Sequence, residues 1–240
     1  SITLQPRQEQ LFNIENAPIE SFKAAEIGHI TSSIERTIRL NKWSTILIVC
    51  AILILAYPVL AILPIIGIVL KIMAHKSGAV QLEYTLEDEK EEEYNRRIEA
   101  WKVLAENEKT WQIIQEAFVS NSKVNAGANR NVKRVLCKIE TATPFYVNTN
   151  VKTIQIRLNK EIFLLLPDKV FIIRKGKVGV VNYEDVNISV SHTRFIESDT
   201  VPRDAVVVGT TWQYVNKNGT PDRRYSNNRQ LPVCQYGVVY

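Results

Sequence analysis

The longest apolar stretch of the chain runs from Trp43 to Leu70 and contains no charged side chain over 28 residues. A cation stands at either end of it, Lys42 before and Lys71 after. A helix in the core of a globular protein normally keeps one polar face, whereas a helix that spans a bilayer is apolar all round. The pattern therefore predicts a membrane segment over residues 43–72, with the lipid bilayer as a partner.

The length of this stretch is compatible with more than one arrangement. As a single helix it would reach roughly 42 Å, which exceeds the hydrocarbon core of about 30 Å. Pro58 also removes a backbone donor near its middle. The stretch is expected to form either one kinked span or a helical hairpin bent near Tyr57–Pro58. Because Lys and Arg prefer the cytoplasmic side, cations at both ends favour the hairpin. A buried core helix of a soluble protein is the remaining alternative.

Residues 1–42 form an N-terminal helical region. Five apolar residues recur there at helical spacing, namely Phe22, Ile27, Ile30, Ile34 and Ile38. We expect this amphipathic helix either to lie at the membrane interface or to pack on the rest of the protein.

Residues 81–135 are expected to hold a long acidic helix and its connection. Over residues 81–119 the apolar side chains follow a helical period and include Trp101, Trp111 and Phe118. Five basic and eleven acidic side chains lie between residues 81 and 120. The acidic residues gather in the first turns, where they suit the positive end of the helix dipole.

From residue 145 to residue 240 the apolar period becomes that of strands. Turn signals separate the strands, and the clearest is the basic turn Arg174–Lys177 around Gly176. This range predicts an antiparallel β-domain, a curved sheet or half-open barrel. Its last strand is still apolar at Tyr240, which predicts a truncated domain. The expected fold class is therefore an α+β membrane protein.

Charge and cysteine usage add to this organisation. Residues 81–120 carry a net charge of −6, whereas residues 121–240 carry +9, and such asymmetry predicts separate segments with separate partners. The 42 residues before the apolar stretch do not fit a secretory signal peptide. Outside that stretch only Cys137 and Cys234 remain. Two cysteines are too few for a disulfide framework and predict reduced thiols facing a cytosol.

The sequence offers little catalytic chemistry. The three histidines, His29, His75 and His192, are far apart, and no spacing of His, Cys and carboxylates fits zinc. No nucleophile elbow, Walker loop or zincin helix occurs. The sequence therefore predicts no catalytic residue, no metal site and no cofactor.

One loop is a candidate binding site. Arg223, Arg224 and Arg229 lie close after Trp212 and Tyr214. Arginine forks bind phosphate or carboxylate, and aromatic rings stack on bases or lie at membrane interfaces. Three interpretations stay open: a turn locked by Asp222 and nearby carbonyls, a site for an anionic ligand or lipid headgroup, and a nucleic-acid site, which is the least favoured.

Several segments share one resemblance: Ile113–Gln115, Asn125–Ala128, Pro144–Val151, Leu166–Asp168, Val178–Asp185, Thr193–Glu197, Thr211–Tyr225 and Asn228–Val233. They resemble an uncharacterised family of bacterial proteins that carry the sequence YVNKxGxPDRR. The resemblance covers roughly residues 95–240 and implies further sequence beyond this chain. It implies no activity and no catalytic residues. Residues 166–185 also resemble the opening strands of bacterial pleckstrin-homology-like modules, which is an analogy of fold and not of function.

Two function classes follow from these observations. The favoured one is a membrane-anchored interaction or sensor module in the bacterial inner membrane, with its soluble parts in the cytoplasm. Its β-domain would bind a protein partner or anionic headgroup, and its acidic helix would assemble with other subunits, including copies of itself. The alternative is a membrane-associated enzyme or nucleic-acid-directed effector of a stress or phage-defence system. The lack of a catalytic pattern favours the first class.

Overall fold

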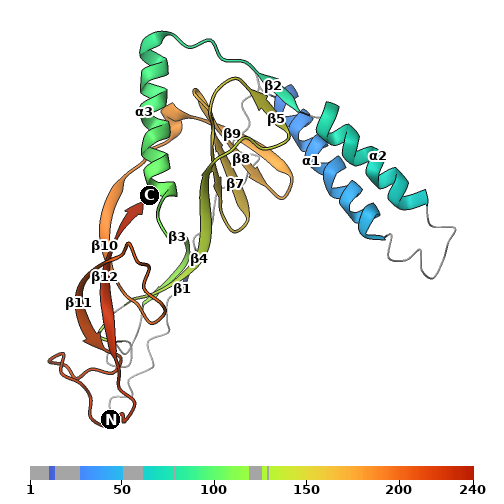
Figure 1. Ribbon diagram of the computed structural model, residues 1–240. Coiled ribbons are helices and arrows are strands. Elements are labelled where there is room, and N and C mark those ends of the chain that lie inside the picture. The colour runs from blue at the N-terminus through green and yellow to red at the C-terminus, as the bar shows by residue number, and fades with distance from the viewer. Residues whose placement is uncertain (1–10, 14–27, 51–61, 78, 119–125, 129) are drawn as a thin grey trace, which may run out of the picture. The chain divides into compact units, whose positions relative to one another are not determined.

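The chain folds into two compact units. The computed structural model describes residues 11–13, 28–50, 62–77, 79–118, 126–128 and 130–240 (Figure 1). Unit 1 comprises residues 1–16, 107–137 and 187–240, and unit 2 comprises residues 17–106 and 138–186. The range 145–240 therefore contributes strands to both units.

Unit 2 is built on an antiparallel meander. Its strands are β6 (Ile154–Arg157), β7 (Glu161–Leu165), β8 (Lys169–Arg174) and β9 (Lys177–Asn182), in that spatial order. Lys175 and Gly176 join β8 to β9 with φ angles of 51° and 81°. Two residues with positive φ are typical of the turn that matches the twist of a hairpin. The predicted turn at Arg174–Lys177 is confirmed.

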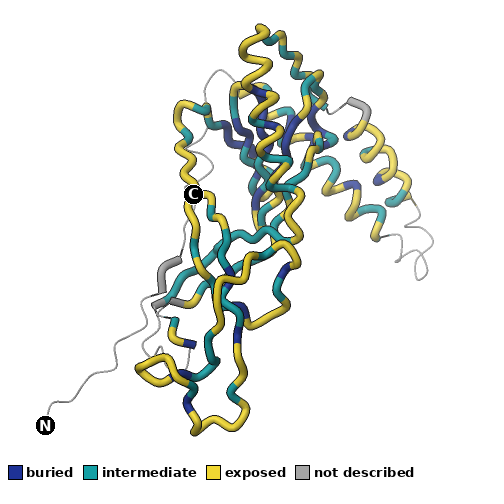
Figure 2. The backbone as a smooth tube through the Cα atoms, turned by 60° about the vertical axis from the view of Figure 1, so that its left-hand side comes forward, coloured by how far each residue is buried: buried dark blue, intermediate teal, exposed yellow. Residues whose placement is uncertain are grey.

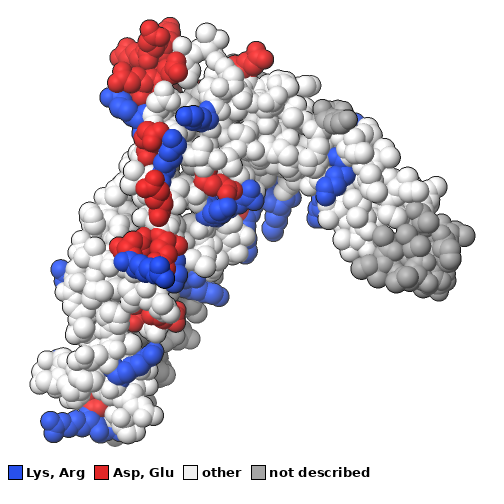
Figure 3. Space-filling model, in the orientation of Figure 1, with Lys and Arg blue, Asp and Glu red and all other residues white. Residues whose placement is uncertain are grey.

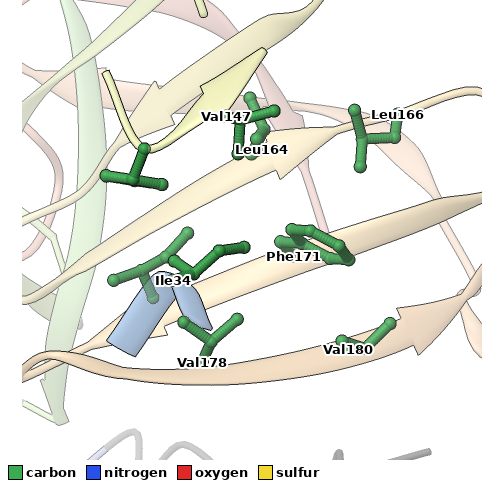
Figure 4. Close-up of a cluster of buried hydrophobic side chains, with 9 residues drawn as sticks. Ile34, Val147, Leu164, Leu166, Phe171, Val178 and Val180 are labelled. Atoms are coloured by element: carbon green, nitrogen blue, oxygen red, sulfur yellow. The ribbon is translucent and has the colours of Figure 1, made fainter. Parts of the chain in front are cut away.

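A helix covers each face of this meander. α1 (Gly28–Val49) places Ile34, which is fully buried, against a core that includes Leu164, Phe171 and Val178 (Figure 4). α3 (Asp88–Ala105) buries Tyr94 and Ile98 in a second core with residues of β6, β7 and β8. Neighbouring residues of one strand thus enter different cores. Burial on both faces explains why these strands read as continuous apolar runs.

Short elements complete unit 2. β2 (Val80–Leu82) pairs in parallel with β5 (Val147–Thr149), and a 3₁₀ turn, Tyr183–Asp185, follows β9. The apolar face expected for the N-terminal helix is used for packing on the sheet, since Ile30 and Ile38 flank Ile34 against the core. Phe22 and Ile27 lie outside the described residues.

The second half of α1 packs against α2 (Ile62–Ser77), with small buried residues beside the larger Leu47 and Ile48. α1 buries Thr37 and Ser44, and α2 buries Gly67 and Ala74. Each pair is seven residues apart, which places its members on one side of a helix. The crossing is closest at Gly67, where an added Cβ would lie 2.9 Å from the carbonyl oxygen of Ser44.

The predicted membrane segment is contradicted. Among the described residues, no helix is both long and apolar enough to cross a bilayer. The physical reason is that the described parts of the uncharged stretch belong to two helices that pack on each other. Trp43–Val49 ends α1, whose earlier turns are polar, and Ile62–Leu70 begins the 16-residue α2. The membrane-protein fold class and the inner-membrane location are therefore wrong. The bend expected near Tyr57–Pro58 lies outside the described residues.

The predicted long helix over residues 81–119 is also wrong. α3 ends at Ala105, and residues 110–118 form β3 (Thr110–Phe118), the strand that holds Trp111. β3 pairs with β4 (Arg130–Thr141) in antiparallel register. Trp111, Ile114 and Phe118 match a helical spacing, but pairing with β4, the next strand in the chain, outweighs this local pattern.

Unit 1 contains two small sheets. In one, β1 (Leu11–Asn13), β3 and the first part of β4 are neighbours. The last four residues of β4, Lys138–Thr141, belong to unit 2 and pair there with β6. The other sheet has β12 (Gln230–Val239) between β10 (Val190–Ile196) and β11 (Val206–Trp212). A bulge interrupts β11 between Val207 and Gly209.

Replacing Gly67 by Ala should loosen the α1–α2 crossing. Gly to Ala in a helix normally stabilises by about 1 kcal/mol, but here the new Cβ meets backbone, which cannot move aside cheaply. We expect a net loss of about 1–3 kcal/mol, measured as faster amide hydrogen exchange in α2. Gly237→Ala is the control, because nothing lies within 4 Å of its added Cβ. Slower exchange in the Gly67 variant would contradict the close crossing.

Candidate functional site

The arginine loop of unit 1 is held together by its own contacts. The Arg224 guanidinium grips the buried Asp222 carboxylate, with Nε 3.0 Å from one oxygen and Nη2 2.6 Å from the other. Arg229 donates to the Ser198 carbonyl at 3.2 Å. Arg223 is exposed and lines an open depression beside Arg224. Contacts from Asp222 and a carbonyl oxygen fit the interpretation of a locked turn.

The aromatic residues predicted with these arginines lie at the base of the same loop. Tyr214 stacks on Tyr225 with ring centroids 3.9 Å apart, and Asn228 exchanges two hydrogen bonds with the Tyr214 backbone. Trp212 ends β11 and is partly buried. The stacked Tyr214 ring is therefore occupied by Tyr225, which leaves the loop better described as a closed turn than as an open cleft.

A buried ion pair that the sequence did not reveal lies between the sheets of unit 1. Arg134 of β4 makes two hydrogen bonds, of 2.8 and 2.5 Å, to the carboxylate of Glu197, which is 2% exposed. The guanidinium also lies 4.2 Å from the Trp111 ring centroid, and Tyr236 meets Trp111 edge to face. Arg134 and Glu197 are 63 residues apart, so no local pattern could have linked them.

The electrostatics of this pair follow from its surroundings. Burial works to raise the pKa of Glu197, but the hydrogen bonds and positive charge of Arg134, together with the effects of Tyr236 and Lys109, outweigh burial and hold that pKa below its ordinary value. Burial and the adjacent Glu197 carboxylate raise the pKa of Tyr236. Arg134 thus contacts both Glu197 and Trp111, and Trp111 contacts Tyr236. Such a cluster connects the strands that carry these residues and fits a structural role.

In unit 2, an open depression beside α3 is lined in part by the side chain of Arg97. Its lining includes Arg97, Asp168 and Tyr183. Arg97 lies 4.6 Å from the Tyr183 ring centroid and donates to the Pro167 carbonyl at 3.3 Å. The arginine thus ties α3 to the loop before β8. Among the described residues, no group of three or more His, Cys, Asp or Glu side chains could hold a metal ion.

The most unusual surface of unit 2 belongs to α1 and α2. Ten large apolar side chains at the end of α1 and along α2 are at least 40% exposed. Figure 2 shows the exposed positions of the backbone in yellow. We call these ten side chains the outer apolar face: Trp43, Ile46, Val49, Ile62, Ile65, Ile66, Ile68, Val69, Ile72 and Met73. Ser44 and Gly67 meet at the helix crossing beside Leu47 and Ile48, while these ten large side chains stay exposed, which is unusual for the apolar side of a helix pair. The sequence analysis identified these residues as part of an apolar stretch but predicted that the stretch lies in a membrane.

The helix pair has a firm base in unit 2. The Glu35 carboxylate accepts a hydrogen bond of 3.0 Å from the Val178 backbone N–H of β9. Near the end of α2, His75 stacks on Phe145 with ring centroids 4.7 Å apart. The outer apolar face is therefore carried on helices that the sheet and its loops hold in place.

No protein-family model, curated protein or solved structure matches the chain. The resemblances based on the YVNKxGxPDRR motif and on pleckstrin-homology-like strands stay predictions. The site must therefore be judged on its geometry, and the outer apolar face is the surface whose composition departs furthest from that of an ordinary protein exterior.

Glu197→Gln should show the pH signature of the buried pair. A lowered pKa in the folded state contributes stability above the unfolded value of about 4.3, and this contribution is lost as the pH falls through the folded pKa. We expect the variant to be about 3 kcal/mol less stable than the parent at pH 7, with the gap closing below about pH 4. Urea unfolding at several pH values measures this. The exposed Glu83→Gln is the control, and a gap that does not change with pH would be the contrary result.

Proposed function

We propose that this chain is a protein-interaction module, in which the outer apolar face of α1–α2 is the docking surface and the sheet of unit 2 is its base. The observation that carries the proposal is the number of large apolar side chains that this one helix pair leaves exposed. Ser44 and Gly67 meet at the helix crossing beside Ile48, while ten other large apolar side chains of the two helices stay at least 40% exposed.

The free energy of burying apolar side chains favours a partner that covers the outer apolar face. Complete burial of one large aliphatic side chain contributes about 1.5–3 kcal/mol, and two of the ten, Ile62 and Ile65, are 60% exposed. Isolated apolar residues are common on protein surfaces, but a contiguous group of this size marks an interaction surface. When a partner docks and buries these side chains, their hydrophobic burial stabilises the complex.

The base of the helix pair makes docking efficient. Ile34 in the sheet core and the bond from Val178 to Glu35 hold α1 before any partner arrives. A surface held in its bound shape loses less conformational entropy on association. The interaction function therefore depends on unit 2 as a whole and not on the helix pair alone.

Site-specific photo-crosslinking in the native cells tests the proposal. A benzoylphenylalanine at Ile68 of α2 should give protein adducts on irradiation, because 50% of this residue is exposed within the face. The matched control is Val103 of α3, which is 66% exposed but lies outside the face and should give none. Absence of protein adducts at Ile68, or equal adducts at both positions, would contradict a docking role.

A further inference from the structure

The outer apolar face has the spacing with which helices pack on helices. Along α2, one series of exposed residues alternates steps of three and four: Ile62, Ile65, Val69 and Ile72. A matching series on α1 consists of Arg36, Arg39, Trp43 and Ile46. Such 3–4 alternation keeps a seam of side chains facing a neighbouring helix, and β-branched residues are favoured in such seams. The face therefore fits another pair of helices.

The α1 series begins with charge. Arg36 and Arg39 are exposed, and so is Lys42 next to Trp43. In the part of the chain that the structure describes, these three cations make no ion pair. An occupant of the face that also brings carboxylates would neutralise them, so charge complementarity narrows the choice of partner.

The chain itself carries the complementary charge. The first turns of α3 hold four exposed acidic residues, which form the red cluster at the upper end of that helix in Figure 3: Asp88, Glu89, Glu91 and Glu92. The ion pairs found in this stretch of the described chain involve their neighbours, Glu87 with Lys90 and Glu93 with Arg97. Within its described residues, unit 2 thus presents an apolar seam, cations beside it that make no ion pair and carboxylates on another helix that make none.

We infer that the outer apolar face is covered by a second copy of this chain. The α1–α2 pairs of the two copies pack on each other about a two-fold axis, and Arg36, Arg39 and Lys42 of each copy face the acidic turns of the other copy's α3. A two-fold arrangement makes both contacts twice, because each copy supplies both surfaces. This inference rests on the proposed function and names its partner.

The area available suits such a dimer. Ten half-exposed side chains supply on the order of 300–600 Å² of apolar surface, if complete burial of one corresponds to about 60–120 Å². A stable complex buries about 800 Å² per partner, of which about two thirds is apolar in homodimers. The outer apolar face therefore provides the apolar part of a standard interface, and the charged turns provide its rim.

Sedimentation velocity of the full chain over a range of concentrations tests the dimer. We expect the triple variant Ile65→Gln, Val69→Gln and Ile72→Gln to raise the dissociation constant at least about a hundredfold. The control is Val190→Gln, Val206→Gln and Val239→Gln, three exposed valines of unit 1, which should leave it within about threefold. Circular dichroism verifies that each variant is folded. A parent chain that stays monomeric, or equal weakening by both variants, would overturn the inference.

A charge swap separates the specific dimer from unspecific apolar adhesion. One variant carries Arg36→Glu, Arg39→Glu and Lys42→Glu, and the other carries Asp88→Lys, Glu91→Lys and Glu92→Lys. Each variant alone should associate more weakly than the parent, because like charges then meet across the interface. Mixing the two should restore association as a heterodimer.

The outcomes separate this inference from the proposed function. A mixture that associates no better than either variant alone would overturn the charged contacts and with them the two-fold dimer. Binding to phosphatidylcholine vesicles in place of self-association would overturn it as well. A monomeric chain that still gives protein adducts at Ile68 would overturn the second copy while the docking role stands. A chain that neither self-associates nor gives protein adducts at Ile68 would overturn both proposals.

Discussion

The continuity of α1 is the constraint on which unit 2 depends. One helix, Gly28–Val49, enters the sheet core with Ile34 and leaves it to form the crossing with α2 at Ser44. Because a helix bends little without a proline or an insertion, fixing its first half also fixes the direction of its second. The hydrogen bond from Val178 to Glu35 and the close approach at Gly67 then hold the two helices to one base. The outer apolar face follows from this geometry, since the crossing covers one side of each helix and leaves the large apolar residues of the other sides exposed.

The two units use different means to achieve order. Unit 2 relies on apolar cores on both faces of a meander, centred on residues such as Phe171 and Ile98. Unit 1 has much of β11 exposed and joins its sheets through the buried pair of Arg134 and Glu197 with the rings around it. A buried ion pair adds little net stability compared with apolar packing. It does disfavour incorrect strand arrangements, because a buried charge without its partner destabilises the fold. The charges of unit 1 thus define its arrangement, whereas the packing of unit 2 supports an interaction surface.

Local patterns in the sequence predicted the strands of the meander, the turn at Arg174–Lys177 and the apolar side of α1 around Ile34, because each depends on residues close in the chain. They did not predict the fate of residues 43–72. An uncharged stretch has the same sequence pattern whether it forms one helix or parts of two. Only the packing of α1 on α2 shows that Gly67 lies at the helix crossing and that Ile65 is exposed. The strand at Trp111 and the Arg134–Glu197 pair depend on residues far along the chain, so composition and spacing carry no signal for them. The contacts of the arginine loop were foreseen as one of three interpretations.

Hydroxyl-radical footprinting read by mass spectrometry tests the central claim most directly, because it reports the exposure of individual side chains. Met73 is the sole methionine and is 50% exposed, Trp43 is 56% exposed, and Phe171 is 1% exposed. In dilute solution, we predict rapid oxidation of Met73 and Trp43 and slow oxidation of Phe171. Protection of Met73 and Trp43 should appear as the chain concentration rises, while Phe171 does not change. Protection of Met73 and Trp43 equal to that of Phe171 in the dilute monomer would contradict an outward apolar face.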